Sequence, residues 1–162
     1  MGHALTRTML AVRLDVDQSD DWSMVRTEQG PLRVGERIPD ATLHAGDGKP
    51  VRLHDLIDDS FVALYFTDVR RRPAIPADQR WLKHRVVSRR DAPLDSGLRD
   101  RALFDVGDKF RLRAGCETDT VMLVRPDDHI AAIIPMRDGA IEDIYARIIR
   151  ETEAENREVK VQ

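Results

Sequence analysis

Cysteine is almost absent from this sequence, and its scarcity excludes most thiol chemistry. Among 162 residues there is one cysteine, Cys116. One thiol cannot close an internal disulfide, and dithiol exchange needs a second cysteine to resolve the mixed disulfide. The amino end also lacks the apolar segment of a signal peptide, since Arg7 and Arg13 surround only a very short apolar piece. We therefore expect a cytoplasmic protein without disulfides.

Long hydrophobic runs, aromatic residues and excess charge are scarce as well. No apolar run approaches the ~20 residues that span a bilayer, so we expect no membrane partner. The net charge of −3 carries no basic signal, and Trp81 alone could offer a base-stacking platform near the basic residues, so we expect no nucleic-acid partner. With 41% hydrophobic and 34% charged residues, the composition is that of one globular domain with a single core.

Signals for metals and cofactors are missing too. His44, His54, His84 and His129 do not occur as the close pairs that are typical of zinc sites, so we expect no metal. The glycines are scattered singly or in turns, with no GxGxxG run to bring a backbone against a pyrophosphate. We therefore expect no cofactor and no catalytic residues.

The apolar pattern that is present predicts an α/β domain. The expected elements, in order, are a strand at 41–44, a short helix at 51–57, a buried strand at 61–66, a helix from Pro76 to about Leu82, a strand at 84–87, a broken helix at 100–113, strands at 120–124 and 129–134, and a helix from Asp138. This order, with a parallel half and an antiparallel hairpin, predicts the mixed sheet of a thioredoxin-like βαβαββα sandwich.

The chain divides into three parts. Residues 1–33 form an N-terminal arm or linker, separated by the break at Gly30-Pro31. Residues 34–155 form the thioredoxin-like domain. Residues 156–162 form a polar tail that we expect to fray. Whether the arm packs on its own core or on another copy stays open.

One segment carries a family resemblance. DTVMLVRPDDHIAAI closely resembles the LVRPDG-H-V-A-W segment of flavin-dependent aromatic hydroxylases, the group of phenol hydroxylase, hydroxyphenylpropionate hydroxylases and polyketide hydroxylases. Those enzymes end in a thioredoxin-like domain. The less specific stretch GERIPDATLHAGDGKPVRLHDLIDDSFVALYF resembles the opening half of such domains, and the likeness covers about residues 9–150. This chain departs at Asp128, where the family usually has glycine, and at Ile133, where tryptophan is common.

The resemblance implies that this chain corresponds to the C-terminal domain of such a hydroxylase alone, without the domain that binds flavin. Relatives with redox activity carry their thiols just after the central strand. Here Thr67–Pro76 contains no cysteine, and Arg70 stands where a peroxiredoxin has its reactive cysteine. Asp119 stands where thioredoxins have a proline. We therefore expect a protein that is not an enzyme.

Two sets of residues are candidate sites. The stretch from Arg70 to Arg90 contains eight basic residues and one acidic residue, Asp78. They indicate either a docking face for an acidic partner or a phosphate or, more simply, a solvated face balanced by acids elsewhere. The candidate docking residues are Arg70, Arg71, Arg72, Arg80, Lys83 and Arg85.

The second candidate is the thiol of Cys116. Arg113 nearby would favour a reactive thiolate, whereas Glu117 and Asp119 would oppose it. We favour a small packing residue in a loop.

These observations leave three hypotheses. The first is a non-catalytic module for assembly, as a homodimer or docked to a flavoprotein. The second is an auxiliary subunit that a separately encoded FAD-dependent aromatic hydroxylase requires. The third and weakest is a divergent thiol protein, which predicts that Cys116 titrates near neutral pH.

Overall fold

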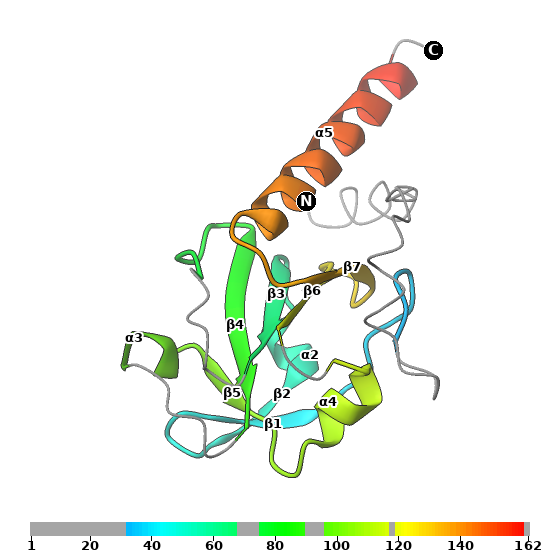
Figure 1. The fold of residues 1–162 in the computed structure, drawn as a ribbon. Helices are drawn as coiled ribbons and strands as arrows, with labels where there is room; N and C mark the ends of the chain where they lie inside the picture. The colour runs from blue at the N-terminus through cyan, green and yellow to red at the C-terminus, as the bar shows by residue number, and fades with distance from the viewer. Residues whose placement is uncertain (1–31, 68–74, 90–95, 117–118, 161–162) are drawn as a thin grey trace.

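A seven-stranded mixed sheet forms the centre of the molecule (Figure 1). The computed structural model describes residues 32–67, 75–89, 96–116 and 119–160. The strand order is β2-β1-β5-β4-β3-β6-β7. The elements are β1 Thr42–Ala45, β2 Pro50–Arg52, α2 Leu53–Leu56, β3 Phe61–Phe66, β4 Leu82–Ser88, α3 Ser96–Arg99, β5 Ala102–Phe104, α4 Lys109–Ala114, β6 Thr120–Val124, β7 Ile130–Pro135 and α5 Ala140–Lys160.

The predicted central strand is confirmed. All six residues of β3 are buried, as expected for an apolar run covered on both faces. β3 pairs in parallel with β4 and antiparallel with β6. The predicted hairpin is also present, since β6 pairs antiparallel with β7. β3 therefore joins the parallel half of the sheet to its antiparallel half.

Each face of the sheet has its own core. One core, here called the α4 face, packs α2 and α4 against the sheet and includes Leu53, Leu64, Phe66, Phe110, Cys116 and Met122. The other, here called the α5 face, packs the first half of α5 against the sheet and includes Phe61, Tyr65, Leu82, Leu123, Ile141 and Ile148. Within the described residues, no helix is both long enough and apolar enough to cross a membrane.

The last helix is longer than predicted. Its buried positions, Ile141, Ile144, Ile148 and Thr152, follow helical spacing and stop at Thr152. The helix nevertheless continues to Lys160 and extends away from the sheet (Figure 1). The expectation that the tail frays from residue 156 is therefore wrong for residues 156–160. Glutamate, arginine and lysine are good helix formers, and they dominate this stretch.

The prediction of a helix that begins at Pro76 is wrong. Pro76 and Asp78 do suit a helix start, but the chain makes a bridge between Gln79 and Leu82 and begins β4 there. A longer-range contact explains this. The Asp78 carboxylate accepts a hydrogen bond of 2.8 Å from the backbone N–H of His84, at a position of β4 that β5 does not reach. Asp78, which would suit the first turn of a helix, instead accepts a hydrogen bond from a backbone N–H on the unpaired edge of β4.

The predicted broken helix at 100–113 is half wrong. Its first part is strand β5, which pairs in parallel with β4. Only its second part, α4, is helical, and the left-handed backbone of Gly107 (φ 80°) and Asp108 (φ 55°) separates the two. Likewise Val51, predicted in a helix, lies in β2 opposite Leu43. In both places strand pairing, with distant β4 for β5 and with neighbouring β1 for β2, outweighs a weak local helical pattern.

The LVRPDDH segment builds the β6–β7 turn. The Arg125 side chain donates from Nε and a terminal nitrogen to both carboxylate oxygens of Asp127, at 2.9 and 2.7 Å. Asp128 follows with a left-handed φ of 66°. Its carbonyl accepts the N–H of Ile38, which ties the start of the domain to the hairpin. The residue that departs from the hydroxylase pattern thus occupies a conformation in which glycine is unstrained.

We expect Asp128→Gly to be more stable than Asp128→Ala by about 1 kcal/mol. Both variants lose the exposed 3.1 Å ion pair with Arg37, which contributes little. Only alanine must hold a Cβ in the left-handed region. Urea unfolding of the two variants measures the difference. Equal midpoints would contradict the backbone argument, because the two variants differ only in the Cβ.

Candidate functional site

The carboxyl ends of the parallel strands are the first place to look for function. In open α/β sheets ligands bind beyond these ends. β3, β4 and β5 run in parallel, so Thr67, Ser88 and Asp105 come together at one edge of the sheet. Antiparallel β6 begins at the same edge, where Thr120 lies opposite Phe66.

Buried polar residues gather at this edge. Each is at most 3% exposed: Thr67, Ser88, Asp105, Arg111 and Thr120. Such groups need partners, because an unpaired buried polar atom is costly.

Asp105 shows how these partners are supplied. Its two carboxylate oxygens accept the backbone N–H groups of Phe110, at 3.2 Å, and Arg111, at 2.8 Å. Its own N–H donates to the carbonyl of Ser88 at 2.9 Å. Asp105 therefore starts α4 and joins it to β4, which is a structural task that leaves no free carboxylate for proton transfer.

Catalysis by a hydroxyl at this edge would need a nearby base. Three of the described histidine rings bond elsewhere, and the fourth, His44, has its Nδ1 buried away from solvent. His84 Nδ1 lies 2.9 Å from the Tyr65 hydroxyl, on the α5 face. The rings of His54 and His129 lie 3.0 and 2.8 Å from the backbone carbonyls of Ile38 and Asp127.

The thiol of Cys116 is on the α4 face and is 1% exposed. Sγ donates weakly to the carbonyl of Ala114 at 3.6 Å. Burial raises the pKa of Cys116 from its ordinary value of 9.0 to about 12, and the opposing effect of nearby Arg111 is the smaller of the two. At neutral pH the thiol is therefore protonated, which supports the packing interpretation and opposes the third hypothesis.

The basic docking residues are only partly described. Arg70, Arg71 and Arg72 lie outside the described residues. Lys83 pairs with Asp58 at 2.6 Å and Arg85 with Asp78 at 2.8 Å. These two cations are thus balanced by acids of the same chain.

Arg80 behaves differently. Its guanidinium lies 4.6 Å from the ring centre of Trp81, which is 46% exposed. The docking face stays a prediction, and Arg80 with Trp81 is its most accessible described part.

Sequence reasoning missed the buried pair of Tyr65 and His84. Tyr65 is 4% exposed and His84 fully buried, with Nε2 of the ring lacking a partner within the described ranges. Burial lowers the pKa of His84 and raises that of Tyr65. The signal in the sequence was alternation along β4, which puts His84 on the same side as Leu82 and Val86.

Metal ligands do not converge in the described ranges. No group of three or more histidine, cysteine, aspartate or glutamate side chains there could hold an ion.

Comparison with known proteins supports the fold. No family profile and no curated protein matches the sequence. Among solved structures, the chain is similar to the thioredoxin domain of a thiol-disulfide oxidoreductase from Bacteroides vulgatus (14% identity, 72% of this chain and 99% of that one, TM-score 0.52). It is also similar to the peroxidoxin BcpB from Mycobacterium tuberculosis (13% identity, 74% of this chain and 97% of that one, TM-score 0.53). The chain therefore has a thioredoxin-like fold.

Proposed function

We propose that this chain is a non-catalytic thioredoxin-like module that acts in assembly by associating with a second copy of itself. The single observation that carries the proposal is the state of Cys116. It is the sole cysteine in the sequence, and it is buried, with a pKa raised to about 12. The structural neighbours are named for thiol chemistry, which needs an accessible thiolate.

The relation to aromatic hydroxylases belongs to the same proposal and rests on sequence. The segment LVRPDDH resembles their carboxyl-terminal domain, and in this chain its Arg125 and Asp127 shape a turn. A motif that builds a hairpin is consistent with a scaffold that has no chemistry of its own. On this proposal a hydroxylase activity would belong to a full-length flavoprotein and not to this chain.

The surface offers apolar residues for self-association. Leu112 on α4 is 72% exposed and Val159 on α5 is 76% exposed. Val159 stands in the part of α5 that extends beyond the last buried position, Thr152. A helix that leaves its own domain can pack on a second copy.

Size-exclusion chromatography with light scattering, read at ~280 and ~450 nm, tests the proposal. Aromatic side chains absorb at the first wavelength, and bound flavin would absorb at the second. We expect a dimer that absorbs only at the first. Val159→Asp should shift the dimer toward monomer, since it puts a charge in an apolar contact. Leu112→Asp makes the same change on α4, and a shift toward monomer there as well would place α4 in the contact. A yellow species would overturn the non-catalytic assignment, and a colourless monomer would overturn self-association.

A further inference from the structure

Two adjoining hollows lie beside β1, with volumes of about 390 and 440 Å³, and they share His44 and Val106. The larger one opens between residues 39–42, which lead into β1, and residues 105–113, which run from the end of β5 through α4. We infer that this larger hollow binds a small organic anion with an apolar body, whose negative group pairs with Lys109 and Arg113.

The sheet itself creates the hollow. β1 pairs with β5 only at two positions, His44 with Phe104 and Ala45 with Leu103. β5 then ends, and the left-handed Gly107 and Asp108 turn the chain into α4. The start of β1 and the start of α4 therefore diverge at the carboxyl edge of the parallel strands, the side where α/β sheets bind ligands.

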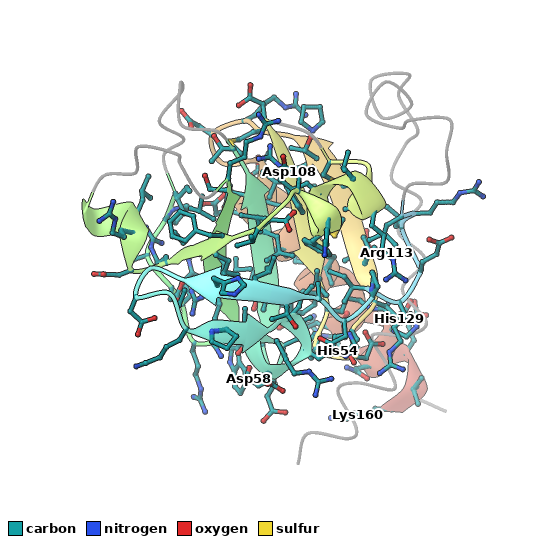
Figure 2. The ribbon with its side chains drawn as sticks, turned by 90° about the horizontal axis from the view of Figure 1, so that it is seen from below. His54, Asp58, Asp108, Arg113, His129 and Lys160 are labelled. Carbon is teal, nitrogen blue, oxygen red and sulfur yellow. The ribbon has the colours of Figure 1, made fainter. Side chains whose placement is uncertain are left out.

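Two cations and two acids line the hollow, and they differ in whether their side chains have partners. Lys109 and Arg113 stand one turn apart on α4, both are exposed, and neither has a hydrogen bond or ion pair within the described ranges. Figure 2 labels Arg113 on this helix. Two unpaired cations at this spacing can contact one anionic group.

The acids that line the hollow are already engaged. The Asp40 carboxylate accepts hydrogen bonds from Arg52, with Nε at 2.8 Å, and from the backbone N–H of His54 at 3.2 Å. The Arg52 guanidinium holds the pKa of Asp40 below its usual value. The Asp105 carboxylate is held by the first backbone N–H groups of α4. Neither acid forms an ion pair with Lys109 or Arg113 within the described ranges, although Asp105 keeps its negative charge because its donors are uncharged.

The walls between these charges are apolar. Pro39, Ala41, Val106 and Phe110 line the hollow, and Val106 is 42% exposed. His44 also lines the hollow, but its Nδ1 is buried away from solvent, so this nitrogen offers no polar contact to a ligand there. A volume of about 440 Å³ is within the range of small-molecule pockets. Apolar walls beside two cations favour an amphiphilic anion over inorganic phosphate. This inference goes beyond the proposed function, because self-association requires no ligand.

Titration of the ¹⁵N-labelled full chain, followed by backbone amide shifts, tests the inference. The probe is hexanoate. Two control compounds separate the parts of this probe. Hexanol has the same hydrocarbon chain length without the negative charge, and inorganic phosphate has negative charge without a hydrocarbon chain. We expect saturable shifts with hexanoate, centred on residues 39–44 and 105–113, and binding at least about tenfold weaker for the other two, which corresponds to about 1.4 kcal/mol.

Paired variants make the test specific. Lys109→Gln with Arg113→Gln should weaken hexanoate binding at least about tenfold. Arg157→Gln with Lys160→Gln removes the same charge from the end of α5 and should leave binding unchanged. Non-saturating shifts, shifts centred elsewhere, or equal binding by both double variants would overturn the site. Equal binding of phosphate and hexanoate would overturn its apolar selectivity. None of these outcomes depends on the oligomeric state, so this test can fail while the assembly proposal stands.

Discussion

The thiol of folded Cys116 is expected to react with an aromatic disulfide reagent at pH 8 about 1000-fold more slowly than an exposed thiol. The reacting species is the thiolate. Because burial raises the pKa of Cys116 from 9.0 to about 12, the thiolate fraction at pH 8 falls by about three powers of ten. The reagent must also reach a side chain that is 1% exposed.

A matched control places one thiol on the surface of the same protein. Cys116→Ser combined with Lys49→Cys leaves a single cysteine at a position whose native side chain is 80% exposed. The colour released by each protein gives the two rates, and denaturant should bring both to the same fast rate. If folded Cys116 reacts within tenfold of the control, then the thiol is accessible, and the observation that carries the proposed function fails.

Stability is expected to fall as the pH drops below about 6.5, and His84 is expected to cause most of that fall. His84 is fully buried, and burial lowers its pKa. Above the ordinary value of 6.5 the ring is neutral in both states, so it contributes no pH dependence. Below 6.5 the unfolded chain takes up a proton that the folded chain does not, and stability decreases until the lowered folded pKa is reached.

The surroundings of His84 oppose this effect without cancelling it. Glu142 of α5 and Asp78 raise the pKa of His84, while Arg101 and Arg85 lower it, and desolvation is the largest cause. Tyr65, the hydrogen-bond partner of the ring, is neutral throughout this pH range, since its ordinary pKa of 10.0 is higher and burial raises it further.

Urea midpoints of the wild type and of His84→Gln between pH 8 and pH 5 measure the effect. The glutamine variant should lose about 1–2 kcal/mol at pH 8, because it disturbs a buried hydrogen bond, but it should lose little more on acidification. His129→Gln, at a half-buried turn position, is the matched control and should keep the wild-type decline. The lowered pKa values of Asp58, Asp78 and Asp127 act below their ordinary value of 3.8, outside this range. Parallel declines in all three proteins would contradict the role of His84.

Local patterns in the sequence predicted the elements whose burial is set along the chain. The continuous apolar run of Phe61–Phe66 indicates a strand covered on both faces, and isoleucines at spacings of three and four indicate α5. These patterns are strong because the apolar or polar character of each residue indicates whether that position is buried. The absence of thiols from Thr67–Pro76 likewise follows from the letters alone.

Only the tertiary structure decided the features that depend on distant partners. Pro76 and Asp78 begin no helix, because Asp78 satisfies the open edge of β4, and residues 102–104 pair with that strand instead of forming helix. The hollow beside Lys109 and Arg113 exists because β1 and β5 part after two paired positions.

By itself, then, the sequence determined that this protein has a central buried strand, a hairpin, a long last helix and no dithiol. The tertiary structure decided that Cys116 is buried, that Lys83 and Arg85 of β4 form ion pairs, and that Lys109 and Arg113 of α4 form none within the described residues. The physical reason is that desolvation and ion pairing depend on residues far apart in the chain, which composition and periodicity do not encode.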